Sequence, residues 1–348
     1  MDDNLRDQLK GIFGEYQKSK ADPVRVGLLG QPGAGKSSLI NSITGQDHLA
    51  PVGVKTDHTV EARAYDWNEI QLVDLPGYGT EGFPREGFLD RFGVLRFDAL
   101  LCIASGKFRD EDCEFFRKVT EERKLCLFVR TNLDGLRQKG RSEAELTADV
   151  RDDLARQLGS DDFTLLFVDN ISGRGITELN EAIIGLLSPA RRDQFYRWAK
   201  GTSDSFLAHK REACNKLILW YAAGSAANAL NPIPGVGVAV DLGLATKMQV
   251  DILRSFGFDQ AMLRDFMSRY EFLTAFIAPL LNSLGREAVA LALARFAGKE
   301  LVKWVPFIGP VISASAGAGL VWWAGVDVAD RCLDIARRVR DAEMAEAA

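Results

Sequence analysis

The sequence predicts two domains: an α/β domain with a mostly parallel sheet, and an all-α domain after it. The chain has 348 residues, whereas one domain usually has roughly 100–200. Residues 24–188 alternate short apolar runs with polar helical stretches, which is typical of βαβ units. Residues 190–348 contain only long helical stretches. We therefore expect an N-terminal helix in 1–22, the α/β domain in 23–188 and the helical domain in 189–348.

Six apolar runs are candidate strands of the sheet. Polar helical segments separate the later runs, as the crossovers between parallel strands require. Only Asn68 and Glu69 stand between the second and third runs, so these two should form an antiparallel hairpin. The candidate strands are Val24–Leu29, Val60–Trp67, Ile70–Asp74, Ala99–Ala104, Leu125–Arg130 and Thr164–Val168.

The N-terminal segment predicts a short amphipathic helix over residues 2–20, because Leu5, Leu9 and Ile12 recur at helical spacing. Asp22-Pro23 ends it. We expect this helix to pack against the helical domain.

Charge and cysteine content argue against several classes of protein. Asp and Glu number 48 against 43 Lys and Arg, which disfavours a nucleic-acid coat protein and its excess of cations. The 5 cysteines show no CxxC spacing, so neither a disulfide framework nor a zinc site is expected. The N-terminal residues do not resemble a secretory signal. A cytoplasmic protein without nucleic-acid partners is therefore expected.

A basic segment surrounds the predicted domain boundary. It predicts a solvated helix face, and contact with anionic lipid head groups is the alternative. Its basic residues are Arg191, Arg192, Arg197, Lys200, Lys210 and Arg211.

Residues 30–37 match the phosphate-binding loop G-x-x-x-x-G-K-[ST], with a predicted strand before it and a predicted helix, Ser38–Thr44, after it. The glycines let backbone N–H groups surround the phosphates. Lys36 reaches the terminal phosphates, and the Ser37 hydroxyl can coordinate Mg²⁺. The predicted nucleotide-binding residues here are Gly30, Gly33, Ala34, Gly35, Lys36, Ser37 and Ser38.

The second motif is Asp74-Leu75-Pro76-Gly77, at the end of a predicted strand. In P-loop proteins an Asp here holds Mg²⁺ through water, and the Gly N–H senses the third phosphate. A Thr that closes on Mg²⁺ should lie between the two motifs; Thr59 is the preferred candidate and Thr56 the alternative. We therefore assign Asp74, Ser37 and Thr59 to the metal, and Thr59 and Gly77 to catalysis.

The third motif, Thr131-Asn132-Leu133-Asp134, also ends an apolar strand. Asp134 can accept the guanine N1–H and N2–H groups, which adenine lacks, so the motif predicts GTP. GTPases usually have [NT]-K-x-D here. Asn132 replaces the Lys whose stem packs along the base, which should weaken affinity more than selectivity. Asp169-Asn170 lies where a further loop donates backbone N–H groups to guanine.

Tyr78 directly follows Gly77, where small GTPases commonly carry a Gln that orients the attacking water. A Tyr cannot take that role in the same way. Slow hydrolysis, or a catalytic group supplied from elsewhere, is therefore expected. The alternative is that Tyr78 is only a packing residue.

Three segments resemble the immunity-related GTPases, a dynamin-like family: TVEARAY at 59–65, DLPGYG at 74–79 and FVRTNLD at 128–134. Residues 232–241 and 256–259 resemble that family's helical domain, so the resemblance covers most of the chain. It implies GTP-driven self-association through the nucleotide face into a homodimer or larger homo-oligomer, and action at membranes. It also makes Asp57 a candidate for catalysis in trans, alongside Glu81.

Two stretches without charged side chains, Leu217–Val240 and Trp304–Val326, are long enough to span a bilayer. Central Pro and Asn residues favour buried helices over membrane spans. The function predicted from these patterns is a Mg²⁺-dependent GTPase that binds GTP and GDP. The alternatives are a non-hydrolysing GTP-binding switch or scaffold, and a membrane-inserted protein with a regulatory GTPase domain.

Overall fold

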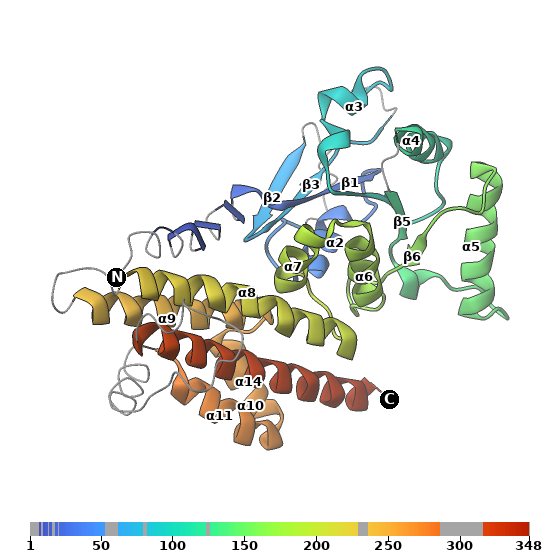
Figure 1. Ribbon diagram of the computed structural model, residues 1–348. Helices are drawn as coiled ribbons and strands as arrows, with labels where there is room; N and C mark the ends of the chain where they lie inside the picture. Colours follow the sequence, from blue (N-terminus) through green and yellow to red (C-terminus); the bar gives the residue numbers. More distant parts are fainter. Residues whose placement is uncertain are drawn as a thin grey trace. The chain divides into compact units, whose positions relative to one another are not determined.

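A computed structural model describes residues 21–52, 62–78, 82–122, 126–228, 236–285 and 316–347, with scattered positions between Asp7 and Ser19 (Figure 1). The chain forms two compact units. One is Pro23–Gly201, and the other joins Met1–Asp22 to Thr202–Ala348.

The first unit contains a six-stranded sheet in the order β2-β3-β1-β4-β5-β6. All neighbouring strands are parallel except β2 and β3, so the predicted mostly parallel sheet with one antiparallel hairpin is confirmed. β4 and β5 are buried along their whole length, which explains their unbroken apolar runs. The strands are β1 (Val24–Gly30), β2 (Arg63–Trp67), β3 (Ile70–Asp74), β4 (Ala99–Ala104), β5 (Cys126–Arg130) and β6 (Leu165–Phe167).

Helices cover both faces of this sheet (Figure 1). α2 (Lys36–Thr44), α6 (Ile176–Leu186) and α7 (Pro189–Trp198) share one face, and α4 (Asp110–Glu121) and α5 (Glu143–Leu158) lie on the other. Short helices α3 (Phe88–Arg91), η1 (Val94–Arg96) and η2 (Leu133–Gly135) lie in the connections.

A buried ion pair fastens α7 to the β2–β3 hairpin. Arg197 Nη2 lies 2.6 Å from Glu69 Oε2, and both side chains are 1% exposed. Trp198 Nε1 donates to the same oxygen at 3.1 Å, and Trp67 Nε1 donates to the Trp198 carbonyl at 3.1 Å. α7 therefore belongs to the sheet unit, which continues to Gly201, although we expected a boundary near 188. For Arg197, the predicted solvated face is wrong.

The last residues of the sheet unit are tied to the end of α2. Lys200 N donates to the Ile43 carbonyl at 2.7 Å. Asn180 Nδ2 donates to the same carbonyl at 3.2 Å and to the Lys200 carbonyl at 2.6 Å. The Ile43 carbonyl, one of the four at the C-terminus of α2 that have no partner within the helix, is thereby satisfied.

The second unit is helical wherever the structure describes it, and Ile12 of the N-terminal segment packs against its core. Lys210 is buried in this unit and donates to the Ser255 carbonyl at 2.5 Å, and burial lowers its pKa to about 7. Lys210 therefore also departs from the predicted solvated face. The helices are α8 (Asp204–Asn228), α9 (Val236–Ser255), α10 (Gln260–Arg269), η3 (Glu271–Leu273), α11 (Thr274–Ser283) and α14 (Ala316–Ala347).

None of the helices in the described ranges has the length and apolarity needed to cross a bilayer. Residues 229–235 and 286–315, which contain parts of both charge-free stretches, lie outside those ranges.

Arg197→Ala should strongly destabilise the sheet unit, because it removes the cation that faces the buried Glu69 carboxylate. Breaking such a pair costs about 3–5 kcal/mol, which for a unit of this size corresponds to about 10 °C in melting temperature. Calorimetric melting of the full chain measures the loss. Arg191→Ala is the matched control, because its 3.7 Å contact with Asp98 is more exposed. Equal melting temperatures for the two variants would contradict this role.

Candidate functional site

The phosphate-binding loop connects β1 to α2 at the carboxyl edge of the sheet. A Cβ on Gly30 would lie 2.3 Å from the Ile103 carbonyl oxygen, so β1 and β4 pass too close for any side chain there. Gly33 and Gly35 have φ values of 82° and 83°, which L side chains rarely adopt. The glycine spacing of the motif therefore follows from its backbone path.

Lys36 folds back over this loop. Its Nζ donates to the carbonyls of Gly30 at 2.8 Å and Gln31 at 3.3 Å, and lies 3.6 Å from Asp74 Oδ1. The side chain is 6% exposed. Burial lowers the Lys36 pKa, and Asp74 partly opposes that change.

Asp74 ends β3 and pairs in register with Leu28 of β1, which brings it beside the loop. Its Oδ1 is buried and accepts no hydrogen bond within the described part of the chain. Burial raises the Asp74 pKa, and the Lys36 charge partly offsets this. A buried carboxylate oxygen with no hydrogen-bond donor among the described residues fits a water molecule on Mg²⁺.

Thr131 joins the base-binding segment to the phosphate loop. Its Oγ1 donates to the Ala34 carbonyl at 2.8 Å, and its backbone N–H donates to the Ala104 carbonyl at 2.9 Å. Arg130, which we did not predict as a site residue, donates through Nη1 to the carbonyls of Ser105 and Thr131. Its signal in the sequence is a basic residue at the end of a fully apolar strand.

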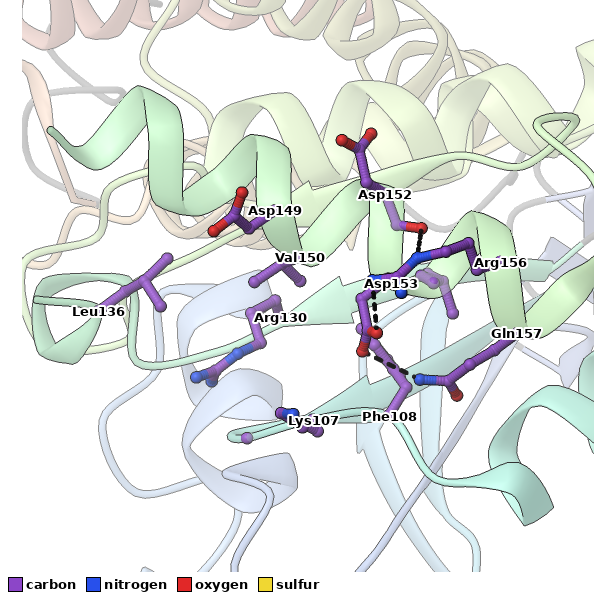
Figure 2. A pocket seen from close by; sticks show the side chains of 12 residues that line it. Lys107, Phe108, Arg130, Leu136, Asp149, Val150, Asp152, Asp153, Arg156 and Gln157 are labelled. Carbon is purple, nitrogen blue, oxygen red and sulfur yellow. Dashed lines mark hydrogen bonds and ion pairs between the residues drawn. The ribbon is translucent and has the colours of Figure 1, made fainter. Parts of the chain in front are cut away.

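A cavity of about 730 Å³ lies beside Arg130. Figure 2 shows Asp149, Asp153 and Gln157 of α5 along one side and Lys107 on the other. Asp149 pairs with Arg141, whose side chain is not drawn, and Asp153 accepts hydrogen bonds from Arg156 and Gln157. Burial lowers the Arg130 pKa.

Asp169 organises the last loop of the site. Its Oδ1 accepts from the backbone N–H groups of Ile171 at 2.9 Å and Ser172 at 2.8 Å, and its Oδ2 from Asp134 N at 3.4 Å. Burial acts to raise the Asp169 pKa, but these hydrogen bonds outweigh it and hold the pKa below its usual value. Its carboxylate therefore shapes the loop, while Asn170 Nδ2 reaches the Gly35 carbonyl at 3.3 Å.

Asp134 lies on η2 with its carboxylate at the surface of the site. Arg174 Nη1 donates to Asp134 Oδ1 at 2.7 Å, and Arg174 Nη2 donates to Glu143 Oε1 at 2.8 Å. Arg174 was not predicted as a site residue, because no nucleotide motif contains it. Asn132 is exposed, with a left-handed φ of 57°.

The Tyr78 side chain is buried in a cluster of aromatic rings. It is 1% exposed and packs edge-on against Phe88 and Phe115, with ring centroids 5.2 and 5.3 Å away. The packing alternative is therefore the one the structure supports. Gly77, immediately before it, is half-buried.

The structure brings together the phosphate loop, Asp74, Thr131, Asp134 and the 169–170 loop, and their contacts with a nucleotide stay a prediction. Four residues predicted near the third phosphate lie outside the described ranges: Thr56, Asp57, Thr59 and Glu81.

Three known proteins similar to this chain are two interferon-inducible GTPases and a probable GTP-binding protein. The chain is 23% identical to interferon-inducible GTPase 5 of Bos taurus, with 91% of this chain and 74% of that protein covered. It is 26% identical to interferon-inducible GTPase 1 of Mus musculus, with 77% and 69% covered. Among solved structures, a probable GTP-binding protein engB is 19% identical at a TM-score of 0.35, covering 47% of this chain and 97% of that one.

The sequence profile of one family, described as Interferon-inducible GTPase (IIGP), matches residues 1–276. This match extends from the N-terminal segment through the whole sheet unit and into the helical unit. It confirms the resemblance drawn from the motifs, and the chain belongs to the interferon-inducible GTPase family.

Proposed function

We propose that the chain binds GTP with Mg²⁺ at the carboxyl edge of the sheet and hydrolyses it there. One observation carries the proposal: Lys36 and Asp74 are both buried against the phosphate loop, and one Asp74 oxygen has no hydrogen-bond donor in the described residues. A phosphate would satisfy the Lys36 cation, and a hydrated metal ion would satisfy the Asp74 carboxylate.

Lys36 provides the cation of the site. On binding, its ammonium exchanges the Gly30 and Gln31 carbonyls for the terminal phosphates. Ser37 and Asp74 would hold Mg²⁺, and Thr59, or alternatively Thr56, would be a further ligand. Bound Mg²⁺ neutralises charge that develops on the phosphate oxygens. Gly77 donates its N–H to the third phosphate.

Asp134 selects the base by accepting the two guanine N–H groups. The loop that Asp169 organises presents its backbone to the other edge of the base. Asn170 and Thr131 each donate to a carbonyl of the phosphate loop, so the base-binding and phosphate-binding segments are joined directly.

Water activation requires a group other than Tyr78, whose ring packs against Phe88 and Phe115 and whose hydroxyl donates to Glu114. From the family resemblance we infer that a second copy docks across the nucleotide and that Asp57 and Glu81 complete the site. We also carry over action at a membrane surface. The burial of Tyr78 equally favours a second candidate, a GTP-binding switch that barely hydrolyses its nucleotide.

The unmodified chain should bind GTP in preference to ATP. Asp134→Asn should weaken GTP binding by about 30-fold or more, because the Asn amide N–H would face a guanine N–H and such an unmatched pairing costs about 2–4 kcal/mol. The same variant should admit xanthosine nucleotides. Equilibrium titration with fluorescent nucleotide analogues measures both effects. Lys36→Ala is the control that should bind neither base class. Equal affinity of the unmodified chain for ATP and GTP would refute the base assignment.

Affinity for GDP in Mg²⁺ should fall on both sides of neutral pH. The raised Asp74 pKa means that this carboxylate takes up a proton at a higher pH than an exposed Asp. The lowered Lys36 pKa means that its ammonium loses a proton at a lower pH than an exposed Lys. Binding should therefore release a proton on the acid side and take one up on the alkaline side.

Calorimetry in buffers of different ionisation enthalpy measures these protons. Asp74→Asn is the control, and it should remove the part of the acid-side release that comes from the protein. Unchanged proton release in that variant would show that Asp74 does not titrate on binding.

GTP turnover per molecule should rise with protein concentration, because the competent species is a dimer whose population follows mass action. Asp57→Asn should lower the turnover reached at high concentration with little change in GTP affinity. The rate of phosphate release measures turnover, and light scattering recorded in parallel measures self-association. Turnover that stays flat over roughly a hundredfold range of concentration would favour the slow switch.

A further inference from the structure

Arg174 is the cation that the structure places at the base site. Its guanidinium joins two carboxylates, with Nη1 2.7 Å from Asp134 Oδ1 and Nη2 2.8 Å from Glu143 Oε1. Within the described part of the chain, the Asp134 carboxylate accepts a hydrogen bond from Arg174 alone. Arg174 therefore fixes the direction in which Asp134 points.

The backbone of Arg174 is held in place. Its carbonyl accepts from Asp169 N at 2.9 Å, and Gly173 N donates to the Asp169 carbonyl at 2.9 Å. Because α6 begins two residues later, at Ile176, the side chain starts from a fixed point. The two side chains are partly exposed, Arg174 by 49% and Asp134 by 38%, so their ion pair lies at the rim of the site.

Asn132 leaves the base site without the usual cation. Its amide lies back over its own turn, since a Cβ added to Gly135 would meet Asn132 Nδ2 at 2.4 Å. A side chain folded over Gly135 does not extend across a base. The site thus lacks both the charge and the stem of the common Lys.

The carboxylate has room for both partners. An ionised Asp offers about four lone-pair positions on two oxygens, of which Arg174 uses one. Guanine N1–H and N2–H can be accepted while the ion pair remains. Without Arg174, Asp134 and Glu143 would repel each other, since one guanidinium now bridges them, and Asp134 would turn towards water.

We propose that Arg174 is a specificity-determining residue of the base site, which positions the Asp134 carboxylate for both guanine N–H groups. This inference rests on the proposed function. Its distinguishing consequence concerns the 2-amino group: a well-oriented Asp134 accepts from N1–H and N2–H together, whereas a free one accepts well from a single N–H.

The test compares GDP with IDP, whose base lacks the 2-amino group, in the full chain with Mg²⁺. Arg174→Ala should weaken GDP by about 5- to 10-fold and IDP much less, because one charge-assisted hydrogen bond is lost only from guanine. Arg174→Lys keeps the charge but cannot bridge both carboxylates. Its GDP affinity should lie between those of the unmodified chain and Arg174→Ala. Arg141→Ala is the matched control, since it removes an ion pair of Asp149 on the same helix as Glu143.

The outcomes separate cleanly. Unchanged or tighter GDP binding by Arg174→Ala would overturn the inference, and so would equal losses for GDP and IDP, which indicate a general defect of the loop. An unmodified chain that binds GDP no better than ADP would instead overturn the proposed function. A preference for GDP over IDP that falls in Arg174→Ala, falls less in Arg174→Lys and stays unchanged in Arg141→Ala supports the positioning role.

Discussion

β1 is the strand on which the nucleotide site depends. It lies between β3 and β4, and its register places Leu28 beside Asp74 and Gly30 beside Ile103. This close packing excludes a side chain at position 30 and turns the loop back over the strand end. Among the described residues, the polar partners of the Lys36 ammonium are the Gly30 and Gln31 carbonyls and the Asp74 carboxylate. One packing constraint thus creates two buried groups. Phosphate can satisfy the Lys36 cation, and a hydrated metal ion can satisfy the Asp74 carboxylate oxygen.

Strands and most strand ends could be predicted from the sequence, because buried parallel strands are continuous apolar runs and their ends carry the motifs. Ile70–Asp74 and Ala99–Ala104 agree residue for residue. That α7 belongs to the sheet unit could not be predicted. Arg197 lies in a basic segment, and its partner Glu69 is 128 residues away. Local charge patterns carry no information about such long-range pairs. A segment that supplies a buried ion pair therefore cannot be told from a solvated helix face by its sequence.

The same division applies to the site. Lys36, Asp74, Thr131 and Asp134 lie within short motifs whose spacing reflects local backbone geometry. Arg130 and Arg174 act through contacts that the motifs do not encode, and Arg174 reaches Asp134 across 40 residues of sequence. Asp169 was predicted from its position in the chain, but its carboxylate shapes the loop that it was expected to present. Sequence motifs therefore indicate which segments meet, whereas side-chain partners between segments require the fold.

α2 connects the phosphate loop to the last residues of the sheet unit. Its first residue, Lys36, belongs to the phosphate loop, and Ile43, near its last turn, accepts the Lys200 N–H just before the chain leaves the sheet unit. A nine-residue helix is about 13 Å long, and it bends far less than a loop. α2 is therefore a rigid connection between the phosphate loop and the segment that leaves the sheet unit. A shift of the phosphate loop along the helix axis will displace residues 199–201 by a similar amount.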